Sequence, residues 1–194
     1  MTRSSVRNYQ GIGAPLRRVE DKRLLTGNGR FVADIELSGA LACALVRSPH
    51  AHAAIRRIDA SAARAAPGVV AVLTGADMAV DGVAPMRPLW VVRSRDGSPM
   101  AEPARFALAR ETVRHVGEPV VAVVAASLAQ AVDAAERVEV DYAPLSAVTD
   151  ARAAQAEAAP QLHACAGGNV CFRWARGDEA AVRAARSPLR PIGC

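Results

Sequence analysis

Two histidines separated by one residue, His50 and His52, are the first candidates for chemistry in this chain of 194 residues. In an extended strand, side chains two positions apart point to one face, and two imidazoles on one face can bind a transition metal. No carboxylate or third histidine stands beside them in the sequence. The pattern therefore favours a structural role for this pair, in a loop or at a strand edge.

A second possible metal site combines His163, Cys165 and Cys171, within a glycine-rich stretch. Structural zinc sites use four ligands and closely spaced cysteine pairs, and no two cysteines here have the C-x-x-C spacing. The sequence therefore favours three unrelated residues over a zinc site. Cys43 lies within an apolar run and is predicted to be a small buried hydrophobic residue.

The candidate acid–base residues are also separated from one another in the sequence. His115 precedes the Gly117-Glu118-Pro119 turn and can act only as a lone acid or base. Glu139 and Asp141 alternate with apolar residues, so they are expected on the solvated face of a strand.

Nucleophile and phosphate motifs are absent from the sequence. Ser48 and Ser127 lack the G-x-S-x-G surroundings of a nucleophile elbow. The glycine pairs at 11 and 13 and at 27 and 29 form no dinucleotide fingerprint, and there is no Walker loop. We therefore assign no catalytic, cofactor-binding or metal-binding residue from the sequence.

Composition narrows the class of protein further. Hydrophobic residues form 51% of the chain and aromatic residues only 4%, so the core must consist mainly of Val, Leu, Ile and Ala. The net charge of +5 arises within the first 30 residues, and the remaining 164 residues are neutral, so no basic face is expected on the main body of the fold, which disfavours nucleic-acid binding. No apolar run approaches the roughly 20 residues of a membrane span. No secretory signal is visible, and we expect a cytoplasmic protein.

Apolar patterning predicts the elements that position these side chains. Strands are expected at residues 41–47, 54–58 and 69–73, with a short alanine-rich helix capped by Asp59 or Ser61 and a turn at residues 74–77. Residues 78–105 show no hydrophobic periodicity and are expected to form a long surface loop, called here the surface excursion. Functional residues often lie in such loops.

The region after residue 119 has the clearest pattern. A β-branched run at 120–125 precedes Ser127, which fits a capping box with Gln130. A helical face of Leu128, Ala131, Val132, Ala135 and Val138 follows, and then an alternating strand at 137–142. Strand, helix and strand predict a crossover unit. Beyond it we expect a turn at 167–169, a strand start at 170–174 and a helix at 179–185.

Several stretches follow one another in a recognisable order. They are Arg18-Val19-Glu20-Asp21, Leu24 to Ile35, Val46 to Ala53, Pro67 to Asp77, Val116 to Val120 and Val138 to Leu145. Together they resemble the opening of the large subunit of the molybdenum hydroxylases, the xanthine dehydrogenase, aldehyde oxidase and aerobic carbon monoxide dehydrogenase group. The resemblance covers roughly residues 11 to 185.

This resemblance implies an α+β fold, the α/β hammerhead. We expect a small mixed sheet, a C-terminal strand–helix–strand crossover and Ala-rich helices. The predicted organisation is a flexible lead-in at 1–17, the hammerhead at 18–150, a linker and the start of the molybdenum-binding domain at 151–185, and an aberrant tail at 186–194.

For function, the resemblance implies an oxidoreductase that hydroxylates an aldehyde, a purine or a similar substrate, or oxidises CO, with water as the oxygen source. The intact protein would hold a molybdenum–pterin cofactor, and partner subunits would hold iron–sulfur centres and FAD. Family catalytic residues lie beyond the matching part, so none is carried over. We expect a fragment that is inactive alone and exposes apolar surface. The alternative is a non-catalytic, stand-alone hammerhead module that binds partner subunits.

Overall fold

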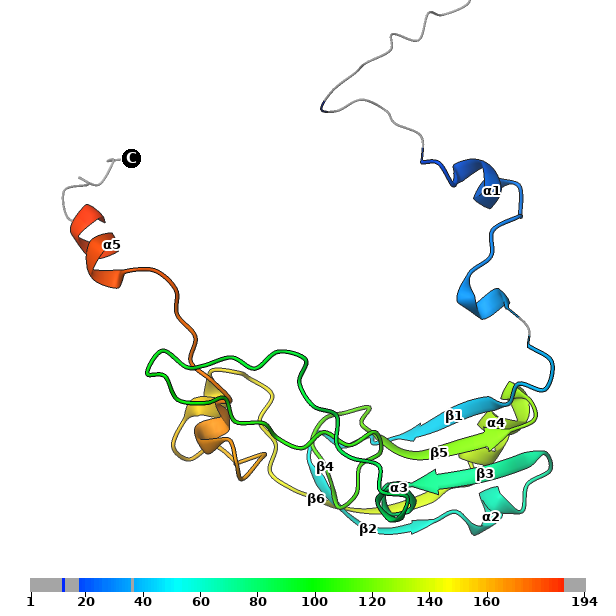
Figure 1. The fold of residues 1–194 in the computed structure, drawn as a ribbon. Helices are drawn as coiled ribbons and strands as arrows, with labels where there is room; N and C mark the ends of the chain where they lie inside the picture. The colour runs from blue at the N-terminus through cyan, green and yellow to red at the C-terminus, as the bar shows by residue number, and fades with distance from the viewer. Residues whose placement is uncertain (1–11, 13–17, 36, 187–194) are drawn as a thin grey trace, which may run out of the picture. The chain divides into compact units, whose positions relative to one another are not determined.

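The computed structural model describes residues 12, 18–35 and 37–186 (Figure 1). The expected lead-in at 1–17 and tail at 186–194 fall outside this part of the chain, except for Ile12 and the backbone of Arg186. The chain divides into two compact units, Met1–Ala40 and Leu41–Cys194.

The elements described in the first unit, at residues 18–35 and 37–40, are short. Helix α1 (Asp21–Leu25) is held by two surface ion pairs, Arg18–Asp21 at 3.0 Å and Arg23–Glu20 at 2.8 Å. A 3₁₀ turn, η1 (Val32–Asp34), follows. Most of the larger apolar side chains in the described part of this unit are exposed: Val19, Leu25, Phe31, Val32, Ile35 and Leu37.

The second unit is built on two three-stranded sheets. One has the order β1-β5-β3, formed by β1 (Ala42–Arg47), β5 (Pro119–Ala125) and β3 (Val69–Thr74). Both pairings are antiparallel, and the valine-rich central strand β5 is the most deeply buried. Central strands have partners on both edges, so a continuous β-branched run suits this position.

The other sheet has the order β4-β2-β6, formed by β4 (Thr112–Val113), β2 (Ala53–Asp59) and β6 (Glu139–Pro144). Its register shifts between Ile55 and Arg57. An irregularity of this kind inserts a residue and changes the face of those that follow. It explains why Ile55 and Ile58, one step out of alternation in the sequence, both pack against the core.

These observations confirm the α+β hammerhead fold class. The expected single mixed sheet is corrected to two separate antiparallel sheets. The predicted strand–helix–strand unit is present as β5, α4 (Leu128–Ala135) and β6, but it connects one sheet to the other. The crossover inference assumed that both strands share a sheet, and sequence periodicity does not specify strand partners.

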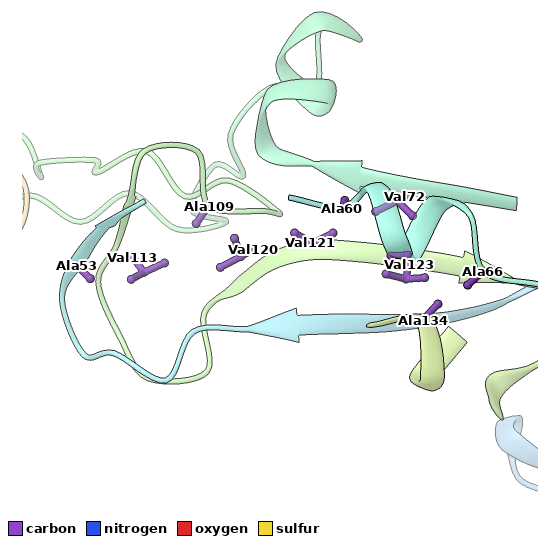
Figure 2. Packing of buried hydrophobic residues seen from close by; sticks show 11 residues of the cluster. Ala53, Ala60, Ala66, Val72, Ala109, Val113, Val120, Val121, Val123 and Ala134 are labelled. Carbon is purple, nitrogen blue, oxygen red and sulfur yellow. The ribbon is translucent and has the colours of Figure 1, made fainter. Parts of the chain in front are cut away.

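Small side chains bring the helices close to the sheet, as Figure 2 shows. Helix α2 (Ser61–Arg64) buries Ala63, and α4 buries Ala131 and Ala134. The predicted face of α4 is therefore corrected, because Leu128 and Val132 are exposed. The predicted cap is confirmed in part, since the Ser127 hydroxyl accepts a hydrogen bond from the Gln130 backbone at 3.3 Å.

Residues 74–77 are a helix start where a turn was predicted. Helix α3 (Gly75–Val80) begins with a capping box, in which the Asp77 carboxylate accepts hydrogen bonds from the backbone and hydroxyl of Thr74, each at 2.7 Å. These hydrogen bonds lower the pKa of Asp77. The T-x-x-D pattern is a helix-start signal that the turn interpretation overlooked.

The last part of the described chain is largely irregular. It contains two 3₁₀ turns, η2 (Ala153–Gln155) and η3 (Gly167–Asn169), and the helix α5 (Glu179–Arg186). The strand expected at 170–174 does not form. In the part of the chain that the structure describes, no helix is both long and apolar enough to cross a membrane.

Candidate functional site

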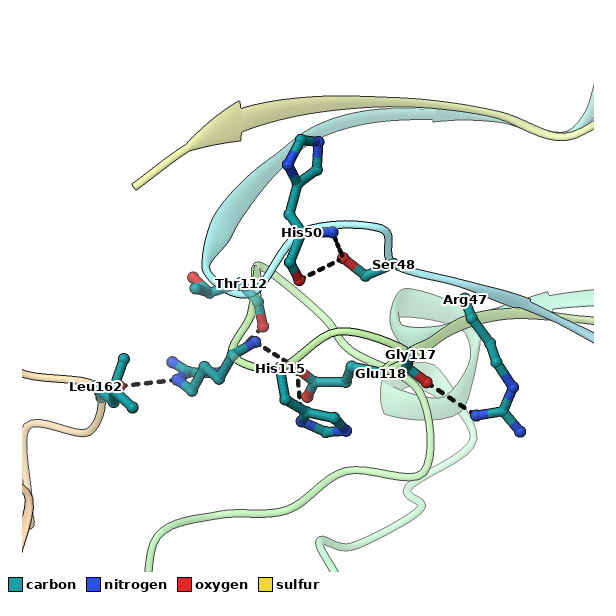
Figure 3. Close-up of polar contacts among 9 residues, drawn as sticks. Arg47, Ser48, His50, Thr112, His115, Gly117, Glu118 and Leu162 are labelled. Carbon is teal, nitrogen blue, oxygen red and sulfur yellow. Dashed lines mark hydrogen bonds and ion pairs between the residues drawn. The ribbon is translucent and has the colours of Figure 1, made fainter. Parts of the chain in front are cut away.

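The loop after β1 and the turn before β5 bind each other through their backbones (Figure 3). Ser48 N donates to Glu118 O at 2.9 Å, and Gly117 N donates to Ser48 O at 2.8 Å. Gly117 has a φ of +83°, a conformation that glycine adopts without strain. The Ser48 hydroxyl is turned inward, where it accepts a hydrogen bond from His50 N at 3.0 Å. Ser48 therefore has a structural role.

Glu118 is the charged centre of this junction. Its carboxylate accepts a hydrogen bond from the Arg114 backbone N–H and lies 3.6 Å from His115 Nδ1. The Glu118 side chain is only 19% exposed, and Arg47 Nη1 donates to the neighbouring Gly117 carbonyl at 2.9 Å. The charged groups here are occupied in holding two turns, and no nucleophile is paired with a base.

Arg114 connects this junction to a distant segment. Its Nε donates to Leu162 O at 2.9 Å and its Nη1 donates to Thr112 O at 3.2 Å. Charge-assisted hydrogen bonds of this type are the stronger ones. No local sequence pattern indicates this role, because Leu162 lies 48 residues further on and accepts through its backbone.

The histidines do not form the pair considered from the sequence. His50 packs edge-on against the Tyr142 ring at a centroid distance of 5.0 Å, whereas His52 Nδ1 lies 2.6 Å from the Ser146 carbonyl. Burial raises the pKa of Tyr142. Burial also lowers the pKa of His163, and the nearby Arg114 guanidinium adds to this effect. His50 and His52 therefore have separate partners and do not act as a pair.

The remaining candidates are dispersed. Cys43 is exposed, which corrects the prediction of burial: it lies on the outward face of β1, whose exposure alternates along the strand. Cys165 is exposed and Cys171 is half-buried. Glu139 and Asp141 lie exposed on β6, as predicted. Among residues 12, 18–35 and 37–186, no three His, Cys, Asp or Glu side chains gather as metal ligands.

A hollow of about 850 Å³ lies beside the junction. Phe106, Arg110, Arg114 and Glu118 are among its lining residues, and the Arg110 guanidinium stacks over the Phe106 ring at 3.8 Å. Such a stack is favourable by about 0.5–1 kcal/mol at exposed sites. It joins two residues of the segment before β4, and we assign it no catalytic role.

The β1–β5 junction lies within a region that matches a known family. The profile described as aldehyde oxidase and xanthine dehydrogenase, a/b hammerhead domain, matches residues 26–146. The chain belongs to this family. The matching region contains both sheets and the turns of Figure 3, so the similarity concerns the structural framework of the hammerhead.

Sequence identity to curated relatives supports the membership of this chain in the family. The carbon monoxide dehydrogenase large chain of Afipia carboxidovorans is 39% identical over 88% of this chain and 21% of its own. The nicotine 6-hydroxylase large subunit of Paenarthrobacter nicotinovorans is 43% identical over 73% of this chain and 16% of its own. This chain thus spans about a fifth of the length of these relatives.

A solved structure shows the same fold. Quinoline 2-oxidoreductase from Pseudomonas putida 86 superposes with a TM-score of 0.71 at 40% identity, and the match covers 89% of this chain and 21% of that one. The similarity to solved structures therefore extends beyond residue 146 into the irregular C-terminal region, since it covers more of the chain than the family profile does.

Proposed function

We propose that this chain is the hammerhead part of a molybdenum-hydroxylase large subunit and that its role is to pack against and orient the rest of that subunit. The observation that supports this most strongly is the family match over residues 26–146, together with coverage of only a fifth of each relative. The turns and capped helices of the match are framework features, and their polar groups are engaged with each other.

The intact protein is proposed to oxidise a small substrate, either by hydroxylating an aldehyde, a purine or a similar compound or by oxidising CO. A molybdenum–pterin group, when bound, supplies the redox chemistry and water the oxygen. This chain matches only about a fifth of the length of each relative, and the turns and capped helices of the match are framework features. We therefore assign cofactor binding and catalysis to residues outside this chain, and the isolated chain is proposed to be inactive.

The proposed partners are the remainder of the large subunit and subunits that hold iron–sulfur centres and FAD. The names of the relatives agree with an assembly of this kind, since one is a large chain and another is the gamma subunit of a dehydrogenase complex. The exposed apolar side chains of this chain are consistent with surfaces that become covered in such an assembly.

A chimaera tests this proposal. The aligned stretch of the Afipia carboxidovorans large chain is replaced by this chain and produced with its partner subunits; molybdenum content and CO oxidation are then measured. We expect a folded chimaera that binds molybdenum and retains activity, and a purified 194-residue chain that does neither. A matched chimaera with Val123→Asp, which disrupts β5, should lose both properties. Turnover by the isolated chain would refute the proposal, as would a folded chimaera without molybdenum.

A further inference from the structure

The only two tryptophans of the sequence, Trp90 and Trp174, are both exposed, at 80% and 64%. Tryptophan is usually largely buried in a folded domain, and aromatic residues are scarce in this chain. Both lie in irregular segments, residues 86–101 and 171–178. We call these two segments together the two-tryptophan surface.

Hydrogen bonds hold the two segments side by side (Figure 1, the green loop beside the orange segment). Arg95 N donates to Arg173 O at 2.7 Å, and Ala101 N donates to Cys171 O at 2.9 Å. Arg173 N donates to the Ser94 hydroxyl at 3.2 Å. These bonds make one surface from segments at least 70 residues apart in the sequence, with a hollow of about 670 Å³ between them.

The exposed groups of this surface are those that dominate protein–protein binding. Leu89, Trp90 and Val91 are consecutive and exposed, and Phe172 and Trp174 are exposed on the second segment. The two segments contain five arginines and two aspartates, an excess of three positive charges. Trp and Arg are enriched among the residues that contribute most to interfaces. An apolar surface with a positive rim is complementary to an acidic, apolar stretch of polypeptide.

We propose that the two-tryptophan surface docks an acidic, apolar segment of the large subunit that lies outside this chain. This inference rests on the proposed function, because the relatives contain about four-fifths of their length beyond the matched part. A nucleic acid fits less well. Asp96 lies on the hollow and Arg95 is paired with Glu179 at 3.3 Å, so part of the positive charge is already neutralised.

The experiment uses the whole 194-residue chain and labelled 15-residue peptides that cover the Afipia carboxidovorans large chain outside the aligned stretch. Binding is followed by fluorescence anisotropy of the peptide and by tryptophan emission, which reports only from this surface. We expect acidic, apolar peptides to bind and to shift the emission to shorter wavelength. Trp90→Ala and Trp174→Ala should each weaken binding at least about tenfold, and Arg93→Glu should weaken it less.

Leu128→Ala is the matched control, because Leu128 is also exposed but lies on α4; it should leave binding unchanged. Circular dichroism checks that the variants remain folded. The inference is overturned if no peptide binds, if both tryptophan variants bind normally, or if single-stranded DNA binds more tightly than every peptide. An active chimaera with no peptide binding would overturn this inference alone, whereas an inactive folded chimaera would overturn the proposed function.

Discussion

The sheet centred on β5 and the two-tryptophan surface differ in which side chains they bury and in how their backbones are paired. In the sheet, Val120, Val121 and Val123 are fully buried and the backbone is paired on both edges. In the two-tryptophan surface the backbone is irregular, the largest side chains face solvent, and a few hydrogen bonds join the segments. The buried sheet therefore depends on small aliphatic residues, whereas both tryptophans of the chain lie on the proposed docking surface.

The largest expected effect comes from placing a charge in the buried sheet. Val123→Asp puts a carboxylate without a partner among side chains that exclude water, and burial of an unpaired charge is very costly. We expect a loss of about 4 kcal/mol or more in the free energy of unfolding, and therefore no cooperative transition in a thermal melt followed by circular dichroism. The same change at Val70, which is exposed on β3, is the control and should alter the melt little.

A second prediction concerns close packing at the start of α3. A Cβ added at Gly75 would lie 2.4 Å from the Ala109 carbonyl oxygen, so the backbone has to move. Gly75→Ala should destabilise the protein by about 1–3 kcal/mol, measured by urea denaturation. A Cβ added at Gly167 would have no other atom within 4 Å. Gly167→Ala should therefore have no comparable effect, and equal losses in both variants would contradict the packing argument.

A smaller and local effect is expected at Arg114. Arg114→Met removes the hydrogen bonds to Leu162 O and Thr112 O but keeps much of the side-chain volume. We expect a loss of about 1–3 kcal/mol that is confined to the segment around Leu162. Faster amide hydrogen exchange in that segment, with unchanged exchange in β5, is the expected result. The exposed Arg56 provides the control substitution, Arg56→Met.

The smallest predicted effect is a pH dependence of the same segment. Because the folded pKa of His163 lies below its usual value of 6.5, the folded form favours the neutral ring. The contribution of His163 to the free energy of unfolding is complete above pH 6.5, and it declines as the pH falls towards the folded pKa. The charges that face this ring are those of Arg114, Glu118 and His52. Hydrogen exchange of residues 160–166, corrected for intrinsic rates, should accelerate on acidification, and His163→Gln should remove this dependence.

The buried half of this comparison was predictable and the exposed half was not. The valine run and the alternation of β6 are local patterns that the structure confirms, and the Ser127 cap is confirmed in part. The buried face predicted for α4 was wrong at Leu128 and Val132. The partition into two sheets and the role of Arg114 depend on residues distant in the sequence, for which periodicity gives no signal. The surface excursion after residue 78 was expected, but its pairing with Arg173 was not. No candidate catalytic residue was assigned from the sequence, and that assignment stays a prediction.

The strand order also determines how the chain can fold during synthesis. Every pairing joins strands that are not neighbours in the sequence: β1 and β3 both pair with β5, and β2 pairs with β4 and β6. Contacts of this kind have high contact order and form slowly. As the chain leaves the ribosome, β1, β2 and β3 emerge first with no partner to receive them, and the first sheet cannot close before Ala125 has emerged. The early strands therefore depend on protection from aggregation until the later strands arrive.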